Sequence, residues 1–255
     1  INAHETGALE SVGHKCLTLP TSNGKITAKQ VDTLIQEHYS DASSEHTVQP
    51  GIVYISFPTE SGTLYSKQEL TELYTVCQSH NIPLFIDGAR LGYGLVSKKN
   101  DVTFEDIANL CDVCYIGGTK VGALFGECIV ILNDLYKKDF RYAIKQHGGM
   151  LAKGRMLGIQ FEELFKDNRY LTISKHAIDM ADILTEGFQS KGYHFYFPAE
   201  TNQLFPIFEN AKLEELSKEF AFTPWAKIDE THTAVRFVTS FATKRENVEY
   251  LLTKI

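Results

Sequence analysis

The 255-residue sequence has no apolar run of about 18 residues, and this absence excludes a membrane-spanning helix. It also lacks an excess of basic residues, because 25 lysines and arginines stand against 32 aspartates and glutamates, a formal net charge of -7. Proteins that bind nucleic acid usually carry a basic face, so we expect no nucleic acid among the partners. Because no apolar run is long enough to span a bilayer, we expect no membrane partner either. A small anionic ligand held in a local site remains compatible with this charge.

Cysteine is scarce and odd in number: Cys16, Cys77, Cys111, Cys114 and Cys128. An odd count in a chain of this length favours a reducing compartment, the cytoplasm, over a disulfide scaffold. One C-x-x-C pair is a weak zinc or redox signal, and the histidines show no metal-ligand spacing, so we expect no metal. The sequence also lacks a G-x-G-x-x-G after a strand, which disfavours a nucleotide-binding dehydrogenase.

Apolar runs alternate with amphipathic stretches through the first part of the chain. The amphipathic stretches predict helices over residues 27–39, 66–80 and 103–110. Strands that are apolar throughout and separated by helices predict a mostly parallel sheet with helices on both faces, an α/β fold. The predicted strands are residues 15–19, 51–57, 82–87, 113–118 and 127–133.

The pattern changes near residue 148. Two long helices are predicted, over 148–165 and 171–192, the second stopped by Gly192. Shorter strand-like and helix-like pieces follow and predict a small C-terminal α+β domain. They cover residues 193–197, 203–208, 211–220, 234–241 and 245–255. We therefore expect a large domain over 1–167 and a small domain over 168–255.

Two residues with catalytic potential lie at the carboxyl ends of predicted strands. Asp87 ends the run 82–87, and Lys120 comes just after the run 113–118. Ligands of open parallel sheets bind at the carboxyl ends of the strands, so the two side chains could share one crevice. Taken singly, an acid before Gly88 is more often a turn cap and a loop lysine is more often solvated. Together they provide the lysine and the acid that pyridoxal phosphate requires.

Three more residues could reach the same crevice. His4 could stack on a flat cofactor ring, although a surface histidine is the commoner case. Arg236 lies in an otherwise apolar strand, where its charge requires a partner, either a ligand carboxylate or an internal salt bridge. Arg90 follows Asp87 by three residues and could face the crevice or pair locally.

The segments together resemble the threonine aldolase and β-eliminating lyase group of pyridoxal phosphate enzymes, which has the aspartate-aminotransferase fold. The motif HETGA at 4–8, followed by DGAR at 87–90 and GTK at 118–120, is specific in this order, although each motif alone is weak. The resemblance is good over residues 1–130 and looser over 148–161 and 235–252.

The resemblance implies one role for each of five residues. Lys120 matches the Schiff-base lysine, and Asp87 matches the acid that binds the pyridine nitrogen. His4 matches the histidine that stacks on the ring and assists proton transfer. Arg90 and Arg236 match the arginines that hold the substrate carboxylate.

The family pattern is incomplete in this sequence. The resemblance implies a Gly-Thr phosphate-binding turn and an asparagine upstream of His4, and nothing precedes Ile1 to supply them. The expectation is therefore a family member that lacks its N-terminal segment. Thr119 is expected to bond the cofactor phosphate. Ala152 and Lys153 replace the family's arginine-glutamine pair, and Lys153 could compensate.

The function implied is that of an aldehyde-lyase in amino acid metabolism. It would cleave the Cα–Cβ bond of a β-hydroxy-α-amino acid such as threonine and give glycine and an aldehyde. A β-eliminating lyase or an aminotransferase would use the same lysine, acid and arginines, so both alternatives stay open. A non-catalytic α/β protein that has kept the fold is a further alternative. The resemblance also implies a homodimer or homotetramer.

Overall fold

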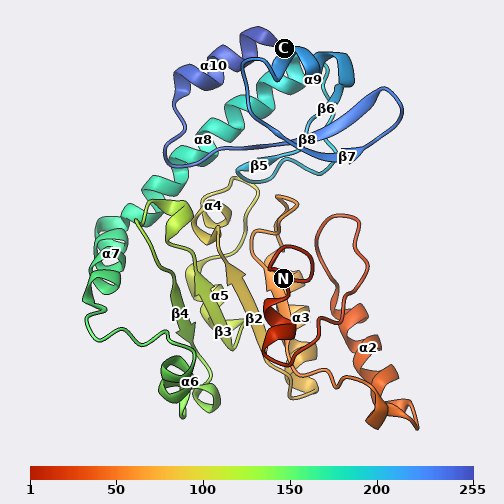
Figure 1. Cartoon of the computed structure of the whole chain (residues 1–255), viewed down its shortest axis with the longest axis vertical. Coiled ribbons are helices and arrows are strands. Elements are labelled where there is room, and N and C mark those ends of the chain that lie inside the picture. The colour runs from red at the N-terminus through yellow and green to blue at the C-terminus, as the bar shows by residue number, and fades with distance from the viewer.

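The computed structural model describes all residues from 1 to 255, and it consists of two parts with a sheet each (Figure 1). The sheet of the larger part has the strand order β1-β2-β3-β4. Its first three strands are parallel, and the last is antiparallel to its neighbour. This confirms the predicted α/β class with a mostly parallel sheet. The strands are β1 (Val53–Ser56), β2 (Leu84–Gly88), β3 (Val113–Ile116) and β4 (Cys128–Ile131).

The main helices of the larger part begin where the sequence predicts them. Thr27, Ser66 and Thr103 each close a capping box, in which the hydroxyl accepts from the N3 amide and the N3 side chain accepts from the cap amide. They start α2 (Ala28–Ser40), α3 (Lys67–Ser79) and α5 (Phe104–Asn109). The shorter helices are α1 (Ala8–Ser11), α4 (Leu91–Leu95), α6 (Phe140–Gln146) and the 3₁₀ turns η1 (Ser44–His46), η2 (Thr119–Val121), η3 (Asp134–Tyr136) and η4 (Lys166–Asn168).

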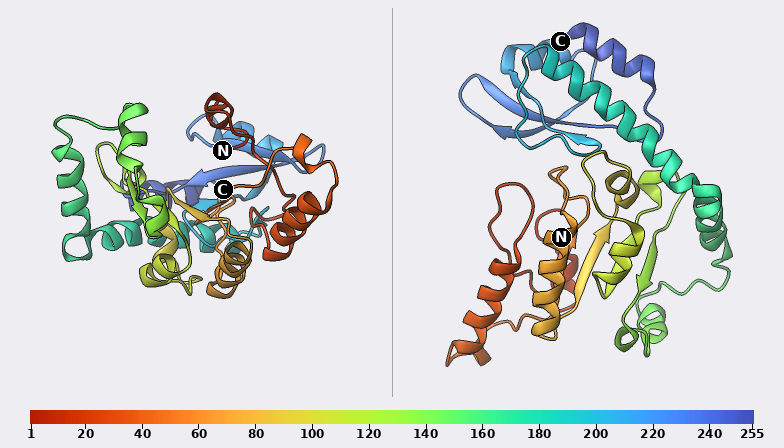
Figure 2. Two further views of the ribbon diagram at one scale, coloured as in Figure 1. Left: turned by 90° about the horizontal axis from the view of Figure 1, so that it is seen from below. Right: turned by 180° about the vertical axis from the view of Figure 1, so that it is seen from behind.

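The two faces of the large sheet differ in burial, because burial alternates along β1, β2 and β3. One face packs into a cluster of 25 buried residues on the side of α3 and α5. The other face is only half-buried, and α1 lies on its side of the molecule (Figure 2). Helices flank the sheet as predicted, and part of this second face opens on a cavity. It carries Tyr54, Ser56, Phe85, Asp87 and Tyr115.

Two helices connect the parts. α7 (Arg155–Phe165) starts seven residues later than predicted, after a stretch in which Gly148 has a left-handed φ of +75°. α8 (Arg169–Ser190) follows a break at Asp167, whose φ is +52°, and ends before Gly192 as predicted. No helix is both long and apolar enough to cross a membrane.

The smaller part is an antiparallel sheet with β8 at its centre, and three helices cover it (Figure 1). A second cluster of 11 buried residues fills the space between sheet and helices. This confirms the predicted small α+β unit. Its elements are β5 (Gln203–Leu204), β6 (Ile207–Glu209), α9 (Asn210–Leu216), β7 (Thr223–Lys227), β8 (His232–Val238) and α10 (Arg245–Lys254), together with the last half of α8.

Two predicted strands are absent. Residues 15–19 form no strand, because they pair with no other strand and Leu17 is exposed. Residues 193–197 make only one isolated bridge, between Phe195 and Pro206. The predicted division at residue 167 stays a prediction, since α8 serves both cores: Ile178 belongs to the larger cluster and Met180 to the smaller.

Candidate functional site

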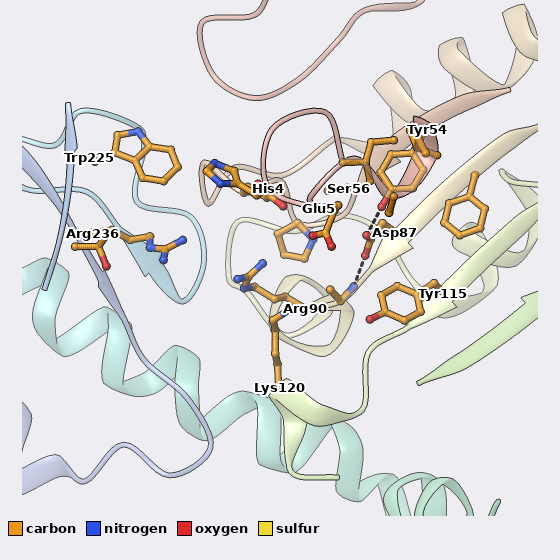
Figure 3. A pocket seen from close by; sticks show the side chains of 18 of the residues that line it. His4, Glu5, Tyr54, Ser56, Asp87, Arg90, Tyr115, Lys120, Trp225 and Arg236 are labelled. Carbon is orange, nitrogen blue, oxygen red and sulfur yellow. Dashed lines mark hydrogen bonds between the residues drawn. The ribbon is translucent and has the colours of Figure 1, made fainter. Parts of the chain in front are cut away.

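A cavity of about 1060 Å³ lies at the carboxyl end of the large sheet, bounded by the N-terminal segment and by the small sheet (Figure 3). It brings together five of the six predicted site residues, from four separate segments. These are His4 near the N-terminus, Asp87 at the end of β2, Arg90 before α4, Lys120 in η2 and Arg236 on β8. A cavity of this size can hold a cofactor and a small substrate together.

Strand register explains the floor of the cavity. Ser56 of β1 pairs with Asp87, and Asp87 pairs in turn with Tyr115 of β3. Residues in register across neighbouring strands lie on the same face of a sheet. Tyr54 and Phe85 stand two residues earlier on their strands and therefore line the same face. The cavity floor is thus built from alternate residues whose neighbours form the buried core.

The carboxylate of Asp87 is fixed by two donors. The Tyr54 hydroxyl donates to Oδ2, and the amide of Ala89 donates to Oδ1 at 2.8 Å. Burial, and then the bond to Asp87, raise the pKa of Tyr54 well above its ordinary value, so the phenol stays protonated and keeps donating. Tyr54 stacks on Phe85 with ring centroids 5.2 Å apart. The carboxylate therefore has one orientation and can accept a further bond from a protonated ring nitrogen.

The loop that carries Lys120 is held by two buried tyrosines, each 1% exposed. The Tyr170 hydroxyl donates to the carbonyl of Gly117 at 3.0 Å, and the Tyr93 hydroxyl donates to the carbonyl of Lys120. The lysine side chain itself is exposed and lines the cavity. A fixed backbone with an accessible amine suits a residue that must form a covalent bond to a ligand.

Thr119 points elsewhere, because it does not line the cavity and its hydroxyl donates to Glu127 at 2.6 Å. Glu127 also accepts a bond from the amide of Gly118. Lys153 does not line the cavity either. The phosphate contacts of these two residues stay predictions.

Two arginines from different parts of the molecule face each other across the cavity (Figure 3). The pKa of Arg90 lies below its ordinary value, chiefly because the residue is buried. The Glu60 carboxylate raises this pKa in part, and the charge of Arg236 lowers it further. Arg236 has a buried Nε without a hydrogen-bond partner. Two guanidinium groups in one cavity, one of them with an unused donor, have the chemistry to bind a carboxylate.

Four further cavity residues escape the sequence reasoning: Tyr54, Glu60, Tyr115 and Trp225. The tyrosines lie inside runs that are predicted as buried strands. Trp225 lies on β7, which the sequence does not predict as a strand because it contains Pro224. The sequence offers one signal that could have drawn attention to Trp225. It is the only tryptophan of the 255 residues.

The residues that line the cavity fit the ring and the aldehyde of pyridoxal phosphate. They also fit the carboxylate of an amino acid substrate. The fixed Asp87 carboxylate suits the pyridine nitrogen, the Lys120 amine suits the aldehyde carbon, and the unused donor of Arg236 suits a substrate carboxylate.

Comparison with known proteins assigns the chain to a family. Residues 1–211 match the model of the Beta-eliminating lyase family. A low specificity L-threonine aldolase of a Pseudomonas species is 31% identical over 222 residues, 85% of this chain and 62% of that protein. The protein of the same name from Pseudomonas aeruginosa is 29% identical over 219 residues, 85% of this chain and 62% of its own length. The chain thus spans less than two thirds of the length of these relatives.

Solved structures agree with this assignment. A threonine aldolase from Leishmania major superposes with a TM-score of 0.94 at 43% identity, over 98% of this chain and 72% of the other. An aspartate aminotransferase from Thermus thermophilus superposes with a TM-score of 0.59 at 16% identity, over 82% and 58% of the two chains. The second likeness shows the shared fold only.

Proposed function

Because this chain belongs to the beta-eliminating lyase family, we propose that it is a pyridoxal phosphate-dependent lyase acting on a β-hydroxy-α-amino acid such as threonine. The proposed reaction breaks the Cα–Cβ bond and gives glycine and an aldehyde. The observation that carries the proposal is the meeting of the Lys120 amine, the fixed Asp87 carboxylate and two arginines in one cavity. The threonine aldolases among the relatives support the choice of substrate class.

Each residue has a definite task in this proposal. Lys120 holds the cofactor through its amine, and Asp87 keeps the pyridine nitrogen protonated. The bound cofactor supplies an electron sink for the electron pair left on Cα. Arg90 and Arg236 bind the substrate carboxylate and orient the bond that breaks. His4 takes the proton of the β-hydroxyl as a general base.

Product analysis with the purified protein tests the proposal. Incubation with threonine is expected to release glycine and acetaldehyde. Pyruvate and ammonia from serine, with no aldehyde from threonine, would replace the aldolase by a β-eliminating lyase. An oxo acid formed without free ammonia would indicate an aminotransferase.

A second measurement tests the cofactor separately from the reaction. The protein is expected to be yellow. Borohydride reduction is expected to remove the colour and to leave the reduced cofactor covalently attached to Lys120. The Lys120→Ala variant is expected to lose nearly all activity, because the covalent attachment of the cofactor is lost. Protein that takes up no added pyridoxal phosphate would contradict the cofactor assignment and favour a non-catalytic relative.

The quaternary structure and location follow from the same proposal. A homodimer or homotetramer is proposed, and light scattering on the purified protein measures its mass. A cytoplasmic location is proposed as well, and microscopy of the tagged full-length protein tests it.

A further inference from the structure

We propose that Trp225 is a positioning residue that holds Arg236 in place for the substrate carboxylate. The identity of the ligand, a substrate carboxylate, rests on the proposed function. The positioning of Arg236 by Trp225 rests instead on the contact between the two side chains and on their place in the cavity.

The guanidinium of Arg236 lies over the indole ring of Trp225, 5.7 Å from the ring centroid. This distance is within the range of a cation–π interaction, for which tryptophan is the strongest aromatic partner. Both side chains lie on the small-sheet side of the cavity, and Arg236 extends from there toward Arg90 (Figure 3). The indole therefore lies where it can set the direction of the guanidinium.

A β-bulge brings Trp225 to this place. In the pairing of β7 with β8, Thr223 is opposite Arg236 and Pro224 is opposite Val235, but the next paired residue is Ala226, opposite Ala234. Trp225 is the extra residue of the bulge. Bulges commonly redirect a side chain beside a functional site. Here the irregularity turns the indole toward the cavity, close to the arginine on the neighbouring strand.

Two aromatic rings pack against Trp225. The Phe205 ring contacts the indole edge-on with centroids 4.8 Å apart, and the Phe197 ring does so at 6.3 Å. Phe205 is 1% exposed, so it belongs to the rigid interior, whereas Trp225 is 36% exposed. The indole is thus supported from the core and open toward the cavity.

An aromatic partner has a chemical advantage over an acidic one at this position. A carboxylate would occupy the donors of Arg236, as Glu163 occupies Arg169 and Glu249 occupies Arg245. The indole face attracts the cation without accepting its hydrogen bonds in the guanidinium plane. The buried Nε of Arg236 consequently has no partner in the chain. Its desolvation cost is recovered when a ligand carboxylate accepts a bond from it.

Steady-state kinetics of two variants test the role. Trp225→Leu keeps an apolar side chain but removes the aromatic face, and it is expected to raise KM for threonine about three- to thirtyfold with kcat within about twofold. Trp225→Phe keeps an aromatic face and is expected to recover most of the loss. Equal KM values in the leucine variant and the wild type would overturn the proposal, as would equal KM values in the two variants when both are raised.

A fluorescence titration gives a readout that needs no turnover. Trp225 is the only tryptophan of the chain, so the emission that Trp225→Phe loses belongs to it. Glycine is expected to change this emission in the wild type, whereas ethanolamine, which lacks the carboxylate, is expected to change it little. Arg236→Met is expected to abolish the response while circular dichroism shows an unchanged fold. A glycine response that persists in Arg236→Met would contradict the coupling of the two residues.

The two tests separate this inference from the proposed function. If the protein cleaves no amino acid but the emission of Trp225 still responds to glycine through Arg236, the reaction is wrong and the carboxylate site stands. If it cleaves threonine and Trp225→Leu leaves both KM and the glycine response unchanged, the role of Trp225 is wrong and the reaction stands.

Discussion

Asp87 depends on a neighbour that stands 33 positions earlier in the chain, because the Tyr54 hydroxyl is one of its two donors. Tyr54→Phe keeps the stack on Phe85 and removes only this hydrogen bond. A hydrogen bond to a charged group contributes about 1.5–3 kcal/mol, so we expect kcat/KM to fall by about ten- to a hundredfold. Titration of the apoprotein with pyridoxal phosphate should show weaker binding as well.

Tyr74→Phe is the matched control for this change, because Tyr74 is a half-buried tyrosine on α3 that does not line the cavity. We expect this variant to keep the wild-type kcat/KM. Unchanged cofactor affinity and activity in Tyr54→Phe would mean that the amide of Ala89 alone suffices to orient the carboxylate.

Single residues also show how far the sequence predicts the site. Asp87 and Lys120 could be predicted because Asp87 ends one apolar strand and Lys120 follows another, and parallel strands end at a common edge. Tyr54 and Trp225 could not, because their roles come from contacts across strands: the β1–β2 register in one case and a bulge against β8 in the other. Glu60 lies in a turn whose direction into the cavity no periodicity encodes.

At the level of elements, α4 carries Arg90 at its N-cap position and is held against α8 by a close contact at Gly92. A Cβ atom there would lie 2.1 Å from Ser174 Oγ and 2.8 Å from the Tyr170 ring. Gly92→Ala is therefore expected to push the helices apart and to lower the free energy of unfolding by about 1–3 kcal/mol. The displaced Arg90 should also raise KM for the amino acid.

Gly158→Ala in α7 provides the control, because a Cβ atom at this exposed helical position meets nothing within 4 Å. Alanine is the better helix former, so we expect this variant to gain about 1 kcal/mol in stability without a change in KM. Urea unfolding compares the two variants. A Gly92→Ala protein as stable as Gly158→Ala would show that α4 and α8 can separate without cost.

The elements themselves follow from the sequence to different degrees. The capping boxes at Thr27, Ser66 and Thr103 mark their helices locally, so these starts could be predicted within a residue or two. The run 15–19 has the composition of a strand but finds no partner strand, and a strand exists only through pairing. The start of α7 differs from the prediction because glycines and a turn precede it.

At the level of the whole molecule, residues 200–203 of the smaller part fasten it to the larger part. Thr201 donates to the carbonyl of Gly62 at 2.9 Å, and Gln203 donates to the carbonyl of Glu60 at 3.2 Å. Glu200 accepts from the amide of Leu64 at 2.8 Å. Gln203 also belongs to β5, which pairs with β8, the strand of Arg236. These bonds therefore join the strand pair of Arg236 to residues 60–64 of the larger part, where Glu60 lines the same cavity as Arg90.

The Thr201→Val variant tests this link, because it removes one buried donor, 3% exposed, and leaves the carbonyl of Gly62 unpaired. We expect unfolding free energy to fall by about 1–3 kcal/mol and KM to rise, since Arg90 and Arg236 then hold their spacing less firmly. Thr233→Val loses a comparable bond, 2.8 Å to Asn210, but wholly inside the smaller part, so it should lower stability and leave KM unchanged. Urea unfolding and steady-state kinetics measure both effects. If the two variants raise KM equally, the smaller part acts through its own stability and not through its attachment at residues 200–203.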